Sequence, residues 1–192
     1  MITIRKNPKT KNYLNLKKKV LSENFTWNYF SDTNNGVSYS DLYQDVPFYS
    51  HTVINRPSPD FPFPTIVDPE WKESVEVFNE IMVHNDLSYK TLYRLNFNST
   101  FYVHDKLSPP HVDHDYPHQN MIVYFSKFDS GKTHVFKKQW PESELIIKPT
   151  DMKYSFKGEE DDIITFDGLN FHCMESPLTN QRRVIMVATF LI

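Results

Sequence analysis

The sequence contains one cysteine and four glycines in 192 residues, and each scarcity excludes a class of protein. A single thiol, Cys173, excludes an internal disulfide framework and any metal or iron–sulfur site built from several cysteines. The low glycine content excludes collagen-like and glycine-linker architectures, so the few glycines are expected at tight turns. Apolar runs are only a few residues long, whereas a membrane-spanning helix needs about 20 apolar residues. We therefore expect a soluble globular protein.

Acidic residues are absent from the first 22 positions, which hold seven basic side chains. The remainder carries 14 basic and 24 acidic groups, a net charge of −10. Contacts to phosphates need a basic surface, so we expect no nucleic-acid partner for this acidic body. The basic segment fits a solvated edge around a short helix better than a nucleic-acid-binding arm. Because no apolar stretch follows it as in a secretory signal, we expect a cytoplasmic protein with no membrane partner.

Short segments dense in β-branched and aromatic residues recur along the second half of the chain, a pattern typical of strands. They lie at 91–97, 100–104, 120–127, 132–137, 144–148, 163–166 and 182–191. The turn Asp129-Ser130-Gly131 is expected to join two of them as a hairpin. Behind one or two helices, this spacing predicts a mainly β fold, a sandwich or jelly roll with helices on one outer face.

The first half of the chain gives mixed signals. The elements it predicts are a strand over 2–5, a helix over 14–23, a turn at Asn34-Asn35-Gly36, and a helix that starts at Asp68-Pro69 and runs through about residue 86. Five prolines between 57 and 69 predict an extended surface crossing, because proline cannot pair in a central strand.

The segment "SPPHVDHDYPHQNMIVYF" contains the clearest chemical signal. His111 and Asp113 are two residues apart, so on an extended strand both side chains point to one face. His172 follows 61 residues later, after a strand and a turn. Two histidines and one carboxylate on one face form the facial triad of non-haem Fe(II) oxygenases, which leaves positions open for substrate and O₂.

Other residues could take part in such a site or have only structural roles. Asp115 has the same strand parity as Asp113 and is the rival carboxylate. Cys173 is expected to point away from the site by strand alternation. His114 and His118 are expected in an exposed loop where they could touch substrate, and surface or packing roles are expected for His104, His134, His51 and His84. The run Glu159-Glu160-Asp161-Asp162 is expected to be a solvated turn.

Two arginines stand ten and eleven residues after His172, at the start of the apolar last strand. An arginine inside a β-barrel is costly unless an anion meets it. The spacing permits either Arg182 or Arg183 to be that residue.

The pattern His111-x-Asp113, His172 and a basic residue about ten positions further resembles the 2-oxoglutarate- and Fe(II)-dependent oxygenase superfamily. The closest resemblance is to its prolyl-4-hydroxylase-like branch, including small versions of the kind that phages encode. It covers about residues 90–192, through "HVDHDYP", "MIVYFSKFDSGKTHVF" and "FDGLNFHCMES…RRVIMVATF". The resemblance implies a double-stranded β-helix with iron bound by His111, Asp113 and His172, and it favours Asp113 over Asp115.

The resemblance also implies how 2-oxoglutarate is bound: its keto acid end on iron and its distal carboxylate on a basic residue. Aligning "RVIMVATF" with the family's last strand favours Arg183, with Ile185, Val187 and Thr189 on the same face and Arg182 facing outward. Tyr124 matches a tyrosine that hydrogen-bonds the same carboxylate in prolyl-hydroxylase relatives. The alternative is a core tyrosine whose hydroxyl is satisfied elsewhere.

The implied activity is hydroxylation of a C–H bond in a peptide or protein side chain, or in a small amino-acid-like metabolite. 2-Oxoglutarate and O₂ are cosubstrates, succinate and CO₂ are coproducts, and ascorbate is a stimulant. We expect a single domain in which 90–192 is the catalytic core and 1–89 a helical and extended support on the substrate side. Segments 57–69 and 104–119 could form a lid. If the protein is virus-encoded, the host cytoplasm is its compartment.

Two other classes stay open. A cupin-type metal enzyme with the same jelly roll would not need 2-oxoglutarate, although its usual His-x-His pair is absent from this sequence. A non-catalytic jelly-roll binding or viral structural module would also explain the strands.

Overall fold

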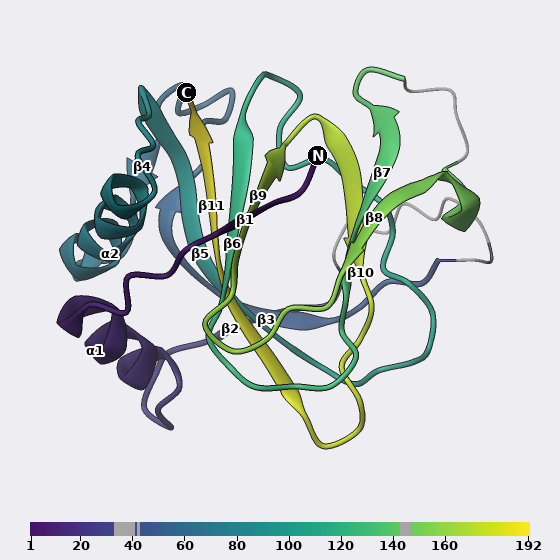
Figure 1. Ribbon diagram of the computed structural model, residues 1–192, viewed down its shortest axis with the longest axis horizontal. Helices are drawn as coiled ribbons and strands as arrows, with labels where there is room; N and C mark the ends of the chain where they lie inside the picture. Colours follow the sequence, from purple (N-terminus) through teal and green to yellow (C-terminus); the bar gives the residue numbers. More distant parts are fainter. Residues whose placement is uncertain (33–40, 42, 143–146) are drawn as a thin grey trace.

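The computed structural model describes residues 1–32, 41, 43–142 and 147–192, and its named strands form two antiparallel sheets (Figure 1). The larger sheet has the order β1-β9-β6-β11-β5-β3-β2, with β4 paired to β3, and the smaller has the order β10-β7-β8. The strands of the larger sheet are β1 (Thr3–Arg5), β2 (Asn28–Phe30), β3 (Phe48–Asn55), β4 (Thr65–Ile66), β5 (Thr91–Phe101), β6 (Gln119–Tyr124), β9 (Ile163–Asp167) and β11 (Arg182–Leu191). Those of the smaller sheet are β7 (Thr133–Gln139), β8 (Met152–Phe156) and β10 (Asn170–Met174).

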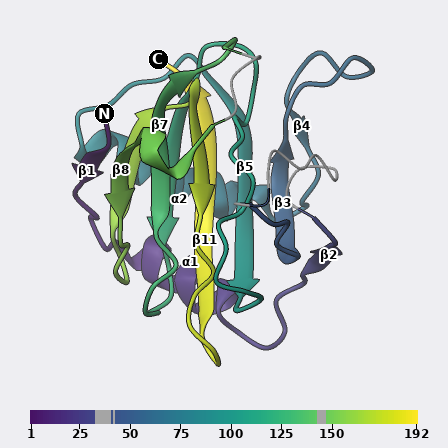
Figure 2. The same ribbon diagram turned by 90° about the vertical axis from the view of Figure 1, so that its right-hand side faces the viewer.

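Two helices cover the outer face of the larger sheet, away from the smaller one (Figures 1 and 2). Helix α1 (Lys11–Val20) begins after Thr10, whose hydroxyl accepts a hydrogen bond from the Tyr13 amide and so caps the first turn. Helix α2 is Trp71–His84, and a 3₁₀ turn, η1, is Pro149–Asp151. The helices of the described ranges fall short of the length and hydropathy that crossing a bilayer requires.

Alternation along β11 separates two apolar layers. Its even-numbered residues Val184, Met186, Ala188 and Phe190 pack against the helices, in one cluster with Leu16, Phe78 and Ile81. The odd-numbered Ile185 and Val187 pack between the sheets, with Ile122, Ile164 and Val135. Arg183 and Thr189 have the same parity as this inner pair, as the sequence predicts. The inner layer is therefore the one that receives polar side chains.

Most of the predicted elements are present with shifted bounds. The fold is the predicted β-sandwich or jelly roll with helices on one outer face, and the strand over 2–5 and the second helix are confirmed. The first helix starts three residues earlier than predicted because Thr10 supplies the cap. The single strand β5 contains the predicted strand 91–97 and the first two residues of the predicted strand 100–104, and the proline-rich crossing pairs through β4. The Asn34-Asn35-Gly36 turn and most of the 144–148 strand lie outside the described residues.

Two local predictions are wrong. Residues Asp129–Gly131 do turn, with positive φ at Ser130 and Gly131, but they carry the chain from β6 in the larger sheet to β7 in the smaller one, so no hairpin forms. His111 and Asp113 are not on an extended strand: between β5 and β6 the chain makes only isolated bridges, at Leu107 and His111. The convergence of these side chains therefore has another cause, described below.

The acidic turn before β9 is also not simply solvated, because Asp161 anchors the basic N-terminal segment. Its carboxylate accepts hydrogen bonds from Tyr13 Oη (2.7 Å) and Lys17 Nζ (2.5 Å), and it pairs with Lys9 Nζ (3.0 Å). Burial would raise the pKa of this carboxyl, but Lys17 and Tyr13 lower it below its ordinary value. The basic segment is thus held against the body by opposite charge.

The substitution Asp161→Asn is expected to lower the free energy of unfolding by about 2 kcal/mol at pH 7, because it removes the anion from this partly buried network. Since the folded pKa of Asp161 is below its ordinary 3.8, the difference from wild type is complete at neutral pH and shrinks as pH falls below about 4. Chemical denaturation at several pH values measures it. Glu159→Gln, an exposed neighbour, is the control, and equal effects of the two variants would contradict the anchor.

Candidate functional site

A reciprocal pair of backbone hydrogen bonds brings two histidines together. The amide of His111 donates to the carbonyl of His172 (3.0 Å), and the amide of His172 donates to the carbonyl of His111 (2.9 Å). This is the hydrogen-bonded pair of an antiparallel ladder, whose two side chains lie on the same face. The two ring centroids are 4.5 Å apart. The bridge to β10 therefore replaces the strand that the sequence suggested for His111.

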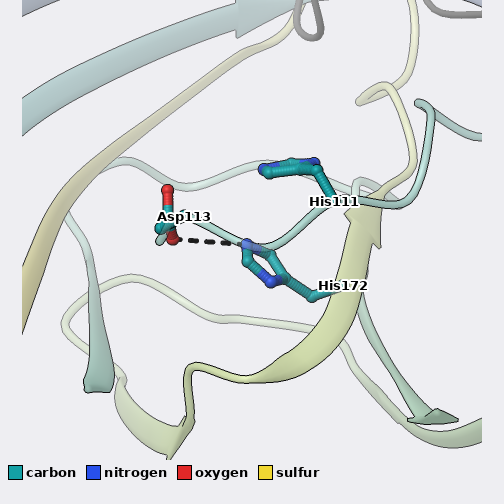
Figure 3. Close-up of side chains that lie close together, drawn as sticks. All are labelled: His111, Asp113 and His172. Atoms are coloured by element: carbon teal, nitrogen blue, oxygen red, sulfur yellow. Dashed lines mark ion pairs between the residues drawn. The ribbon is translucent and has the colours of Figure 1, made fainter. Parts of the chain in front are cut away.

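Asp113 completes a group of three side chains (Figure 3). One potential ligand atom from each of His111, Asp113 and His172 lies within 4.8 Å of the others, and Asp113 Oδ2 is 3.5 Å from His172 Nε2. Asp113 and His172 are buried. The rival carboxylate Asp115 is exposed and outside this group.

The hydrogen bonds of the two imidazoles fix which nitrogen is free. His111 Nδ1 contacts the Pro109 carbonyl (3.1 Å) and His172 Nδ1 contacts the Asn170 carbonyl (3.4 Å). Because a carbonyl only accepts, Nδ1 carries the proton and each Nε2 keeps its lone pair. Burial and the neighbouring His111 lower the pKa of His172 to about 4, so this ring is neutral at pH 7. An unprotonated nitrogen and a carboxylate oxygen thus face each other.

Asp113 is held as an anion by three neighbours from other elements. Arg94 Nη1 donates to Oδ1 (3.0 Å), Asn120 Nδ2 donates to Oδ2 (2.9 Å), and Arg56 Nη1 donates to the backbone carbonyl (2.6 Å). Burial would raise the pKa of Asp113, but neighbouring positive charge, which at neutral pH is chiefly that of Arg94, holds it well below its usual range. The carboxylate is therefore ionised at neutral pH.

This donor set fits a divalent transition metal. Two imidazole nitrogens with free lone pairs and one carboxylate, all from one side, are the ligands typical of mononuclear non-haem iron. A cation between Asp113 Oδ2 and His172 Nε2 would relieve the repulsion of two lone-pair atoms at 3.5 Å. The carbonyls that accept from each Nδ1 and the arginine that donates to Asp113 orient the three side chains. Residues that hydrogen-bond the ligands do the same in known metal sites.

The three side chains line a cavity of about 600 Å³ between the sheets. Arg183 lines the same cavity and is buried, with 2% of its surface exposed. Its Nε donates to the Gly131 carbonyl (3.1 Å) and its Nη2 to Thr133 Oγ1 (2.9 Å), while Nη1, among the described residues, points to Met174 Sδ (3.8 Å). Among the described residues no carboxylate pairs with Arg183, and burial lowers its pKa. A buried cation without a counter-ion suits an anionic ligand.

Tyr124 lies beside Arg183, and Arg182 lies elsewhere. The Arg183 guanidinium carbon is 5.3 Å from the Tyr124 ring centroid, and the Tyr124 hydroxyl contacts Thr133 Oγ1 (2.8 Å). Arg182 is on the opposite face of the sheet, where Nε donates to Ser99 Oγ and the guanidinium covers the Trp27 ring at 5.0 Å. The sheet therefore separates the two arginines, and only Arg183 shares the cavity with the histidines.

Three of the remaining histidines are buried, two of them contrary to expectation. His114 and His118 are buried rather than exposed, and His114 Nε2 contacts Thr189 Oγ1 (2.6 Å). Burial lowers the pKa of His114 to about 3. His134 is buried against Glu175.

Cys173 belongs to an apolar cluster with Phe136 and Phe171, and burial raises the pKa of its thiol.

Sequence reasoning missed three residues of the site: Arg56, Arg94 and Asn120. A signal for Arg94 was present, because β5 alternates Arg94, Asn96, Asn98 and Thr100 with apolar Leu95 and Phe97. Leu95 and Phe97 pack under the helices, while three of the four polar residues, all but Asn96, line the cavity. A strand with one polar and one apolar face indicates a polar interior. Arg56 and Asn120 carry no comparable local signal.

Comparisons with solved structures identify the fold. An oxidoreductase of the 2OG-Fe(II) oxygenase family from Burkholderia pseudomallei aligns over 93% of this chain and 77% of its own, with a TM-score of 0.60 and 14% identity. A prolyl-4-hydroxylase from Pseudomonas putida aligns over 100% of this chain and 92% of its own (TM-score 0.53, 9% identity). The non-haem α-ketoglutarate-dependent epimerase SnoN from nogalamycin biosynthesis aligns over 99% and 78% (TM-score 0.60, 10% identity).

Neither a protein-family model nor a curated protein matches the sequence. The structural likeness confirms the expected jelly-roll fold of 2-oxoglutarate oxygenases. At these identities it establishes the fold, and the chemistry has to be argued from the side chains of this chain.

The two cavity arginines are expected to differ in their effect on stability when no ligand is present. Arg183→Met replaces a buried cation that has no counter-ion, so the free energy of unfolding is expected to change by less than about 1 kcal/mol. Arg94→Met leaves the buried Asp113 carboxylate without its ion pair and is expected to cost about 3 kcal/mol. Urea denaturation of metal-free protein measures both. A larger loss for Arg183→Met than for Arg94→Met would show that Arg183 has a structural counter-ion.

Proposed function

We propose that this protein is a 2-oxoglutarate- and Fe(II)-dependent dioxygenase that hydroxylates a C–H bond and releases succinate and CO₂. The observation that carries the proposal is the convergence of His111, Asp113 and His172 on a cavity that also contains the buried Arg183, which pairs with no carboxylate of the described residues. A non-catalytic module would have no reason to keep either a neutral imidazole facing a carboxylate or an uncompensated buried guanidinium.

In this proposal the metal is held by Nε2 of His111, Nε2 of His172 and a carboxylate oxygen of Asp113. When bound, Fe(II) supplies the activation of O₂ that no side chain of this chain can supply. The protein's own contribution is positional: carbonyls fix the two imidazole tautomers, and Arg94 and Asn120 orient the carboxylate. No side chain acts as a nucleophile.

Arg183 is proposed to bind the distal carboxylate of 2-oxoglutarate through its Nη1 group, whose contact among the described residues is the Met174 sulfur. Tyr124 is proposed to assist by holding Thr133, whose hydroxyl accepts a hydrogen bond from Arg183 Nη2. Gly131 permits the close approach, because a Cβ there would lie 3.3 Å from Arg183 Cδ. The place of Arg182 on the outer face of the sheet supports the choice of Arg183.

The substrate is proposed to be a peptide or protein side chain, or a small amino-acid-like molecule. It would enter through the part of the cavity lined by Phe30, Phe48 and Arg56. These residues come from 1–89, whereas the triad and Arg183 come from 90–192. The first segment is therefore proposed to provide the substrate side and the second the catalytic core.

Purified protein with Fe(II), 2-oxoglutarate, O₂ and ascorbate is expected to release succinate, and His172→Ala is expected to abolish this because it removes one metal ligand. Mn(II) at about 100 times its Kd is expected to stabilise wild type by about 2.7 kcal/mol and His172→Ala by much less. His84→Ala, at the exposed end of α2, is the control. Wild type that binds no metal and forms no succinate would favour the non-catalytic module, and turnover without 2-oxoglutarate would favour a cupin-type enzyme.

Two neighbouring arginines provide a matched test of the cosubstrate site. Arg183→Met is expected to weaken 2-oxoglutarate binding to Mn(II)-loaded protein by about 100-fold, because a charge-assisted pair is lost in a buried site. Arg182→Met is expected to leave binding unchanged, because its side chain is on the other face. Isothermal titration calorimetry measures both affinities. Equal losses in the two variants would refute the assignment.

A further inference from the structure

A second pair of arginines, distinct from the Arg182 and Arg183 pair, faces the cavity next to Asp113. Arg94 is on β5, and Arg56 follows directly after β3. Both line the cavity, and each touches Asp113, at the carboxylate and at the backbone carbonyl respectively. Two chain segments that are 38 residues apart thus bring like charges to one point beside a potential metal ligand. Such an arrangement needs an explanation, because like charges repel.

The contacts within the protein do not satisfy these two guanidinium groups. Each group has five N–H donors, and among the described residues each donates one recorded hydrogen bond. The two positive charges have the one carboxylate of Asp113 between them, which leaves an excess of one positive charge. Burial and the neighbouring Arg56 lower the pKa of Arg94 to about 10, so Arg94 stays charged at pH 7. Asp32 also lines the cavity, and its carboxylate accepts a hydrogen bond from the Ser31 hydroxyl.

The pair is far from the residue proposed to bind the cosubstrate. In the sheet register Arg94 is opposite Thr189 on β11, and Arg183 is six residues earlier on the same strand. At about 3.3 Å per residue, these two backbone positions are about 20 Å apart. The triad lies in the same cavity as both cationic ends. A short dicarboxylate held on the metal and on Arg183 therefore leaves the Arg56 and Arg94 donors for a different molecule.

We propose that Arg56 and Arg94 bind a carboxylate of the substrate, so that the enzyme hydroxylates a carboxylate-bearing molecule at a carbon a few bonds from that group. The inference rests on the proposed function and narrows its substrate class. The planar fork of arginine matches a carboxylate through two parallel hydrogen bonds. A monoanion also neutralises the single excess charge, whereas a phosphate ester would bring nearly two negative charges. Because both arginines touch Asp113, the anchored group lies next to the metal site.

The cavity also offers an apolar wall for the rest of such a molecule. Phe30 on β2 and Phe48 on β3 are stacked, with ring centroids 5.2 Å apart, and both line the cavity. A carboxylate at the arginines and an apolar or aromatic portion against these rings would fix the orientation of the substrate over the metal. A free amino-acid-like acid and an aspartate or glutamate side chain of a peptide share the required chemistry.

The test uses matched acids and amides with Mn(II)- and 2-oxoglutarate-loaded protein. One arm compares the free L-amino acids with their carboxamides, a second compares capped peptides that contain Asp or Glu with the same peptides containing Asn or Gln, and a third uses phosphoserine and inorganic phosphate. Thermal shift and calorimetry measure binding, and stimulated succinate release from the Fe(II) enzyme measures turnover. We expect at least one acid in the first or second arm to bind and its amide partner to bind about tenfold or more weakly.

Arg56→Gln is the diagnostic variant because Arg56 donates to the backbone carbonyl of Asp113 and not to its carboxylate. This variant is expected to lower the affinity for the acid by about tenfold to 100-fold and to leave the affinity for 2-oxoglutarate unchanged. Arg56→Lys is expected to recover part of the loss, and Arg5→Gln, which removes the same charge from β1, is the control. Arg94→Gln also removes the ion pair of Asp113. The acid affinity of this variant is therefore compared with wild type together with its measured affinity for Mn(II).

The outcomes separate this inference from the function on which it rests. If 2-oxoglutarate binds but acids and amides bind equally, if only phosphates bind, if no probe binds, or if Arg56→Gln binds the acid as well as wild type does, the carboxylate site is refuted and the dioxygenase proposal stands. If neither metal nor 2-oxoglutarate binds, the dioxygenase proposal itself fails. Arg56-dependent binding of an acid to such protein would then identify the pair as a carboxylate site of a non-catalytic module.

Discussion

The arrangement of the whole site depends on the two backbone hydrogen bonds between His111 and His172. The segment that precedes β6 has no strand of its own to define its path, and this bridge docks it on β10 of the smaller sheet. The pairing puts two imidazoles on one face and brings Asp113 within reach of both. It also places Asp113 against Arg94 and Asn120, which belong to two strands of the larger sheet. The bridge thus joins groups from both sheets at one point.

Charge inside the cavity is the second constraint, because its described lining holds more positive than negative side chains. The described walls include three arginines, of which only Arg94 has an ion pair among the described residues, with Asp113. Burial of unpaired cations is costly, and an apolar interior of the same volume would be more stable. The excess of positive charge is compensated if anions bind there, at Arg183 from the cosubstrate and at the Arg56 and Arg94 pair from the substrate. Binding of these anions would then stabilise the folded protein.

Much of this account could be predicted from the sequence, because short-range patterns determine it. Alternation along β11 predicted that Arg183 shares a face with Ile185 and Val187, and helical spacing predicted α2. The residue types of the triad were also evident. Contacts between distant segments could not be predicted. No local pattern shows that β6 and β7 belong to different sheets. The same holds for the contacts of Asp161 with Lys17 and of Arg56 with Asp113. His114 and His118 were misjudged because local polarity does not reveal burial.

The most direct test of the central claim is a crystal structure of the protein soaked anaerobically with Fe(II) and 2-oxoglutarate, with anomalous diffraction recorded at the iron edge. The account predicts one strong anomalous peak, about 2.0–2.2 Å from Nε2 of His111, Nε2 of His172 and a carboxylate oxygen of Asp113. It also predicts the distal carboxylate of 2-oxoglutarate on Arg183. An iron atom bound elsewhere, or no anomalous peak at the triad in crystals that contain iron, would contradict it.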